Sequence, residues 1–285
     1  MLFEPPAAIE LWDTPPVATA ALVLAGVVYW RGWRRIRRTR PSLFPDWRLG
    51  CFLAGLFALL LALASPLDTL DDKLLTMHMM QHLVFMSVAP PLLLLGAPVV
   101  PMLRGLPRPV IRRVIGPIFR WRIVHALQKL FSSLAFAWLA MNLFYLGWHV
   151  PAAYELALRS ENWHDVEHAC FFFTSLLFWW PIIQPWPSRF RGSRWVLLPY
   201  LLGADLVNTA LSAFLCFSAR LLYPSYANGP QVFGMSPMND QVAAGALMWV
   251  LGSMIFLAPI MLITLQMLSP RRQSPATGSP LKALL

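Results

Sequence analysis

The sequence predicts an all-α fold of seven transmembrane helices, with the N-terminus outside and the C-terminus in the cytoplasm. Of its 285 residues, 58% are hydrophobic and 13% are charged, which is far from the composition of a soluble globular domain. Seven apolar stretches have the roughly 20 residues that a helix needs to cross the hydrocarbon core. The net charge is +10, and the basic residues lie in short clusters at the ends of apolar stretches. We therefore expect the chain to contact the lipid bilayer and not to bind nucleic acid.

The seven spans are predicted near 15–32, 47–65, 74–96, 131–149, 165–184, 195–217 and 241–268. Twenty of the 23 Lys and Arg residues fall in four segments, which are 31–48, 99–130, 186–195 and 270–285. The positive-inside rule makes these segments cytoplasmic. All acidic residues except Asp46 and Asp205 lie on the opposite side. We therefore expect a single membrane domain over 1–269 and a disordered cytoplasmic tail over 270–285 in a bacterial inner membrane.

The first two spans are predicted from apolar length alone. Between the third and fourth spans, segment 109–129 alternates Arg with bulky apolar residues. This pattern predicts a short amphipathic helix on the inner membrane surface, with a plain linker as the alternative.

The third and fifth spans each carry a pair of histidines four residues apart. His78 and His82 lie near the outer end of the third span, and His164 and His168 near the outer end of the fifth. A spacing of i, i+4 puts both imidazoles of a pair on one helix face, about 6 Å apart. Two such pairs predict a four-nitrogen metal site if the two helices are neighbours.

Other polar residues of the same two spans have supporting roles in this prediction. Gln81 shares the face of the first pair, and Asp165 and Glu167 can orient the rings of the second pair or add oxygen ligands. The fourth span ends at His149, which is a further candidate ligand or an interhelical hydrogen-bond donor.

The sixth span carries a polar stripe that includes Asp205 and Asn208, and the seventh opens with Asp240. An acid within the membrane is a functional candidate by default, although a packing hydrogen bond would also explain Asp205. Methionines near the outer surface would suit Cu(I) as ligands, but methionine is also a common packing residue.

Several motifs resemble the caa3-type CtaG family, whose members are seven-span factors for assembly of bacterial cytochrome c oxidase. The resemblance covers about two thirds of the chain, from the third span to the seventh. Its motifs are His78-Met-Met-Gln-His82, Pro90-Pro91-Leu-Leu-Leu-Leu-Gly96, Trp148-His149-Val-Pro151, His164-Asp-Val-Glu-His168, Phe178-Trp-Trp-Pro181, Leu222-Tyr-Pro-Ser-Tyr226 and Asp240-Gln241.

This resemblance implies a non-enzymatic factor that presents copper, from the outer half of the membrane, to cytochrome c oxidase subunits or to another copper chaperone. Two alternatives come from the residues themselves. A copper permease would use Asp205 and Asn208 as an ion path, and a haem-b electron carrier would use the histidines as axial ligands. Histidines one turn apart on a helix do not favour haem. The sequence shows no nucleophile triad, phosphate loop or dinucleotide motif, so we do not expect an enzyme.

Overall fold

The computed structural model describes residues 15–188, 192–229 and 233–269, and in this part of the chain every regular element is helical. The first half of the chain forms α1 (Pro16–Arg37), α2 (Asp46–Ala64), α3 (Pro66–Thr69), α4 (Leu75–Leu83), η1 (Val84–Val88), α5 (Ala89–Leu95), α6 (Val99–Gly105), α7 (Arg108–Val110), η2 (Ile111–Ile115), α8 (Gly116–Ile118) and α9 (Arg122–Phe131). The second half forms α10 (Leu134–Trp148), α11 (Pro151–Leu158), α12 (Glu161–Ile183), η3 (Arg194–Val196), α13 (Leu197–Phe217), η4 (Pro224–Ala227) and α14 (Pro237–Leu268). The predicted all-α class is therefore confirmed for the described residues.

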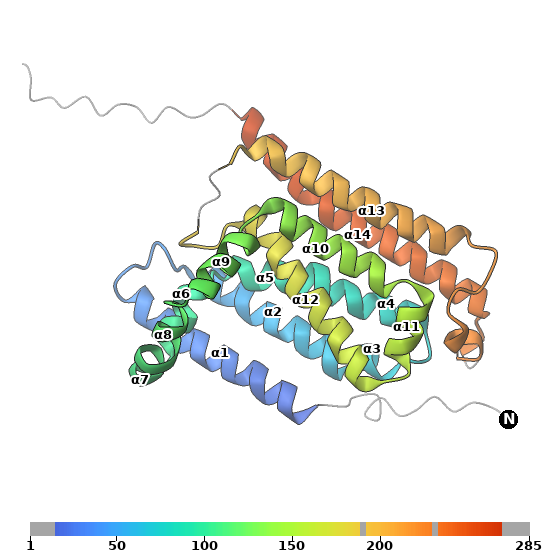
Figure 1. Ribbon diagram of the computed structural model, residues 1–285, viewed down its shortest axis with the longest axis horizontal. Coiled ribbons are helices and arrows are strands. Elements are labelled where there is room, and N and C mark those ends of the chain that lie inside the picture. Colours follow the sequence, from blue (N-terminus) through green and yellow to red (C-terminus); the bar gives the residue numbers. More distant parts are fainter. Residues whose placement is uncertain (1–14, 189–191, 230–232, 270–285) are drawn as a thin grey trace, which may run out of the picture.

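The long helices run roughly parallel to the long axis of one bundle (Figure 1). α13 and α14 pack along each other at one side of the bundle, and α1 and α2 lie at the other. Between them, α4 and α12 occupy the centre (Figure 1). Side chains from α4, α10, α12, α13 and α14 contribute most of the larger of two hydrophobic cores, and side chains from α1, α2 and α5 contribute to the smaller one.

Five helical segments of the described chain are long and apolar enough to cross a membrane: Asp46–Thr69, Leu75–Leu95, Glu161–Ile183, Arg194–Phe217 and Pro237–Leu268. A sixth span results if α9 and α10, which meet at a bend of 77°, are counted together. These segments correspond to the second through seventh predicted spans. The predicted first span lies in α1, but its crossing of the membrane, and the sides on which the termini lie, stay predictions. The predicted tail, 270–285, lies outside the described residues.

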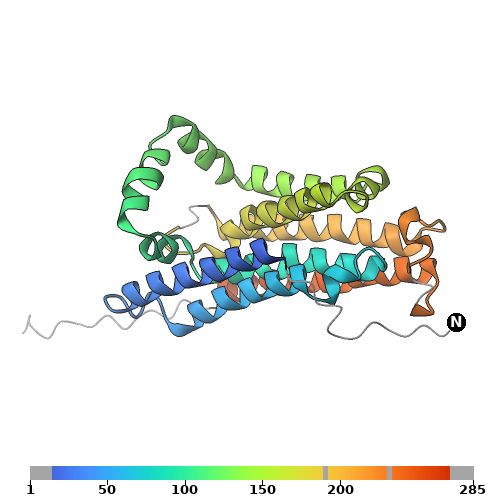
Figure 2. The ribbon, with the colours of Figure 1, turned by 90° about the horizontal axis from the view of Figure 1, so that it is seen from below.

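The segment from α6 to α9 arches away from one end of the bundle (Figure 2). At its start, α6 packs so closely on α1 that a Cβ atom on Gly32 would lie 1.8 Å from the Pro101 carbonyl oxygen. No side chain of α9 is buried. A short helix is therefore present where the sequence predicted an amphipathic one, and its place on the membrane surface stays a prediction.

The third predicted span is one continuous helical run that contains a π-helical turn, η1. Pro90 follows this turn and has no amide hydrogen for the carbonyl four residues earlier, which is that of Met86. The indole nitrogen of Trp179 on α12 donates a hydrogen bond of 3.0 Å to this carbonyl. A neighbouring helix thus replaces the bond that proline removes, as helices in lipid require. The same bond ties α12 to η1, about one turn after His82.

Candidate metal centre

The two histidine pairs meet near one end of the bundle, where α4 faces α12. On α4 the ring centroids of His78 and His82 are 4.2 Å apart, and on α12 those of His164 and His168 are 4.1 Å apart. Between the helices, 5.2 Å separates the rings of His78 and His164, and 5.5 Å separates those of His82 and His168. The fold therefore brings together four imidazoles that are up to 90 residues apart in the chain.

Glu167 lies at the centre of this group, and its side chain is fully buried. Its two carboxylate oxygens lie 3.9 Å from Nε2 of His78 and 3.8 Å from Nε2 of His82. Four residues each offer one ligand atom within 4.8 Å of all the others: His78, His82, His164 and Glu167. We call these four the His–Glu centre.

The His–Glu centre differs from the four-histidine site that the sequence suggested. Glu167, expected in a supporting role, completes the group, while His168 stacks on Phe85 with ring centroids 4.5 Å apart. Ligand atoms around a tetrahedral ion with bonds of 2.0–2.1 Å are about 3.4 Å apart. The distances from Glu167 to the two Nε2 atoms are close to this value, so small side-chain movements would suffice to close the group around an ion.

The ligand atoms of the centre are buried but largely without hydrogen bonds. Within the described residues, both ring nitrogens of His78 and of His82 and both oxygens of Glu167 have no hydrogen-bond partner. A buried polar group without a partner costs roughly 1–3 kcal/mol, and native proteins contain few of them. Each of these three residues thus has a buried donor atom free to hold a metal ion, and one atom from each lies within the 4.8 Å group.

Asp71 adds a second carboxylate that the sequence analysis did not single out. Its Oδ2 lies 3.5 Å from Nε2 of His164. Burial, together with the neighbouring carboxylates of Asp68 and Asp72, raises the pKa of Asp71 to about 8. The one signal in the sequence was the run of acids directly before the third span.

Three tyrosines, also missed at the sequence level, cover the centre toward that end of the bundle. The ring of Tyr154 lies 5.0 Å from that of His78, and its hydroxyl is 3.2 Å from that of Tyr226. Tyr226 donates to the Asp71 carbonyl at 2.7 Å, and Tyr223 donates to the His149 carbonyl at 2.9 Å. These bonds fasten the loop around η4 over the histidines. Tyr223 and Tyr226 belong to a motif that the sequence analysis noted solely as part of the family resemblance.

Asp240 holds α4 in place from the neighbouring helix α14. The first turn of α4 has no capping side chain of its own. Asp240, which is fully buried, accepts hydrogen bonds from the amides of Leu75 at 2.7 Å and of Thr76 at 3.1 Å, and from the Thr76 hydroxyl at 2.6 Å. A carboxylate is favoured at a helix N-terminus because it pairs with free amides and with the positive end of the helix dipole. The structure thus makes Asp240 a helix cap beside the centre.

Gln81 and Asp165, the other two supporting residues of the sequence prediction, lie apart from the ligand atoms. The Gln81 amide donates to the Ala62 carbonyl at 2.8 Å and to Asp68 at 2.9 Å, which ties α4 to the junction of α2 and α3. Asp165 is exposed on α12. Neither side chain is part of the group of ligand atoms.

The predicted polar stripe of α13 divides into two parts. Asn208 is buried and joins three helices, because it accepts from the Tyr145 hydroxyl at 2.9 Å and donates to the Met248 carbonyl at 3.3 Å. Gly252 allows this contact, since a Cβ there would lie 2.7 Å from the Asn208 amide nitrogen. Asp205 is half-buried, and its Oδ1 accepts no hydrogen bond from the described residues. The structure therefore gives Asn208 a packing role.

Fold and site together define a helical membrane protein with a buried histidine–carboxylate cluster near one end of its bundle. The sequence profile of the cytochrome c oxidase caa3 assembly factors (Caa3_CtaG) matches residues 27–269. The chain belongs to this family.

The chain is also similar to uncharacterized proteins of mycobacteria. It is 25% identical to one from Mycobacterium leprae over 252 residues, which are 84% of this chain and 37% of that protein. Proteins from Mycobacterium bovis and Mycobacterium tuberculosis are each 25% identical over 256 residues, which are 85% of this chain and 37% of theirs. The chain thus spans little more than a third of these relatives. No solved structure matches it.

Proposed function

We propose that this chain helps to assemble a haem–copper oxidase by holding a copper ion at the His–Glu centre and passing it to an oxidase subunit or to another copper chaperone. Membership of the caa3 assembly factors supports the assembly role. The observation that carries the copper role is the buried cluster of His78, His82, His164 and Glu167, whose ligand atoms face one another within 4.8 Å. In this proposal the protein lies in a bacterial inner membrane with the centre in the outer half.

The donor set suits an ion that must be released again. Neutral imidazoles bind both copper oxidation states, and copper binds a given set of nitrogen and oxygen ligands more tightly than the other divalent ions of the first transition row. The three cysteines, Cys51, Cys170 and Cys216, are free and lie outside the centre. Without thiolate ligands, the ion can be exchanged for ligands of a partner protein.

The haem and permease alternatives have less support. A cavity of about 20 Å³ adjoins His82, which is room for one water molecule or one ion but not for a porphyrin. An ion path along α13 would need the polar atoms of Asn208, and these already bond to Tyr145 and Met248. Neither alternative accounts for the position of Glu167 among the histidines.

The test is the metal content of purified protein after loading with Cu(II). We expect one copper per chain at the His–Glu centre, and a loss of about tenfold or more in the double variant His78→Ala, Glu167→Gln. His125→Ala is the matched control, because this histidine lies exposed on α9. Unchanged copper in the double variant would refute the ligand assignment.

Two further readings separate the parts of the proposal. If the centre binds zinc in place of copper, the metal site stands, and the proposal that copper is its cargo is refuted. Oxidase activity in membranes of a strain that carries the double variant tests the assembly role. Full activity there, with copper lost from the purified variant, would refute the proposal that this copper is passed to the oxidase.

A further inference from the structure

A cavity lined by buried side chains adjoins His82 on the inside of the helix bundle. Its volume is about 20 Å³, which is enough for one water-sized occupant. Four methionines and two histidines are among the residues that line it: Met79, Met86, Met141, Met248, His82 and His149. Each of these six side chains is at most 4% exposed.

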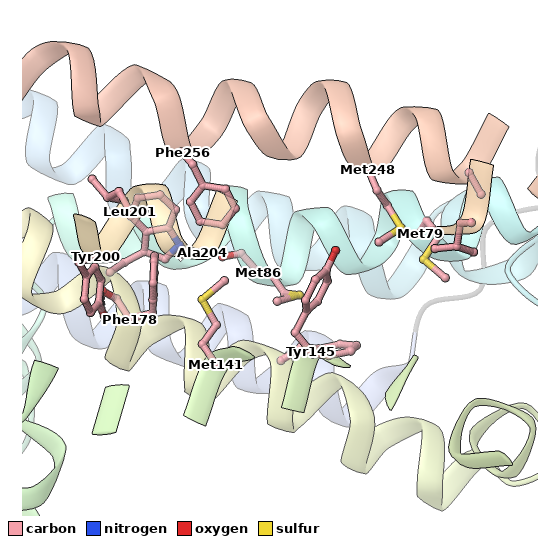
Figure 3. Close-up of a cluster of buried hydrophobic side chains, with 14 of the residues drawn as sticks. Met79, Met86, Met141, Tyr145, Phe178, Tyr200, Leu201, Ala204, Met248 and Phe256 are labelled. Carbon is pink, nitrogen blue, oxygen red and sulfur yellow. Dashed lines mark hydrogen bonds between the residues drawn. The ribbon is translucent and has the colours of Figure 1, made fainter. Parts of the chain in front are cut away.

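The four methionines reach the cavity from four different elements, α4, η1, α10 and α14. Figure 3 shows them with Tyr145 in the interior of the bundle. No single helix periodicity brings them together, so their meeting is a property of the tertiary packing. Thioether sulfur is a soft ligand that favours Cu(I). Methionine also fills gaps in cores, and therefore the methionines alone do not define a site.

His149 supplies the observation that packing does not explain. Its Nδ1 lies 2.7 Å from the Tyr145 carbonyl oxygen. A carbonyl can only accept, so Nδ1 carries the hydrogen and Nε2 has a free lone pair. Nε2 is buried and has no hydrogen-bond partner among the described residues. The carbonyl of His149 in turn accepts from Tyr223, which fixes this residue at both its ring and its backbone.

We propose that this cavity is a second metal site, selective for Cu(I), formed by Nε2 of His149 and thioethers of the four methionines. A hydrogen bond from the other ring nitrogen to a carbonyl is the usual way in which a protein orients a ligating imidazole. The inference rests on the proposed function, since copper must reach the protein. His82 lines this cavity and also belongs to the His–Glu centre, and its ring centroid lies 6.3 Å from that of His149. One imidazole thus borders both sites.

The two sites differ in chemistry. The His–Glu centre, with nitrogen and oxygen ligands, accepts both oxidation states of copper. The methionine cavity offers no carboxylate and accepts Cu(I). Ag(I) is a soft ion of the same charge as Cu(I). It should therefore bind in the methionine cavity in preference to the His–Glu centre.

The experiment titrates the purified protein with Cu(I), without oxygen, against a chromogenic Cu(I) chelator. We expect two Cu(I) ions per wild-type chain and one in the double variant Met141→Leu, Met248→Leu. Exchange of methionine for leucine keeps the volume, and the fold should tolerate it. The control is Met254→Leu, because Met254 lies on α14 with 63% of its surface exposed. It should still bind two ions.

X-ray absorption identifies the ligands of the Cu(I) ion that remains when the His–Glu centre is removed. In the His78→Ala, Glu167→Gln variant, the bound Cu(I) should show sulfur neighbours, and these should disappear when Met141→Leu and Met248→Leu are added. The single variant Met248→Leu serves if the double variant does not fold.

The outcomes distinguish the two proposals. One Cu(I) per wild-type chain, lost with His78 and Glu167, would overturn the second site and leave the His–Glu centre standing. The second site would also be refuted if two ions bind without sulfur neighbours, or if two ions are retained after Met141→Leu and Met248→Leu. In either case, the methionines around the cavity would be packing residues around a water molecule. No bound copper at all would overturn both proposals.

Discussion

Replacing Asp240 by alanine tests whether a carboxylate from α14 holds the histidine helix in place. The change removes the acceptor for the amides of Leu75 and Thr76 and for the Thr76 hydroxyl. The first amide is buried and the second partly so. A buried amide without an acceptor costs about 1–3 kcal/mol, and we expect a total loss of about 2–4 kcal/mol. In a protein of this size, that corresponds to a melting temperature lower by roughly 5–15 °C.

The assay is thermal unfolding of the protein in detergent, followed by circular dichroism. Asp205→Ala is the matched control, because it removes a carboxylate of the same length from the adjacent helix α13, and the Oδ1 atom of Asp205 accepts no hydrogen bond within the described chain. It should melt within about 2 °C of the wild type, as a change without lost contacts does. A melting temperature of Asp240→Ala equal to that of Asp205→Ala would refute the capping argument.

The capping variant should also affect the proposed metal site. His78 lies within one turn of the capped residues, and fraying of this first turn would move its imidazole ring away from Glu167. Copper content should therefore fall in Asp240→Ala although no ligand is changed. Full copper binding together with the lower melting temperature would show that α4 keeps its position without the cap.

Two further predictions concern contacts between helices. Gly252→Ala places a Cβ 2.7 Å from the amide nitrogen of Asn208, so we expect a destabilisation of about 1–3 kcal/mol in chemical unfolding. Gly147→Ala, with no atom within 4 Å of its new Cβ, should be neutral or stabilising, and equal stability of the two variants would contradict the packing argument. Trp179→Phe removes the donor to the Met86 carbonyl and should cost about 1–3 kcal/mol in the same assay. A variant as stable as the wild type would show that this carbonyl needs no partner.

The sequence determined the class of fold and the local geometry of each histidine pair. Apolar length predicted helices at all seven expected positions, and helices are present at each of them. The i, i+4 spacing placed His78 above His82 and His164 above His168, because one turn of helix fixes the distance between such residues. These features depend on neighbours along the chain, and they could be predicted without knowledge of the packing.

The tertiary structure decided which residues complete the site. Glu167 is one residue from His168, yet α12 is rotated so that Glu167, not His168, joins the group of ligand atoms. Asp240 caps a helix that begins 165 residues earlier, and four methionines from four elements meet at one cavity. Such contacts depend on the rotation, depth and crossing of packed helices. These quantities follow from the sum of many side-chain contacts across the bundle, and no spacing within a single helix specifies them.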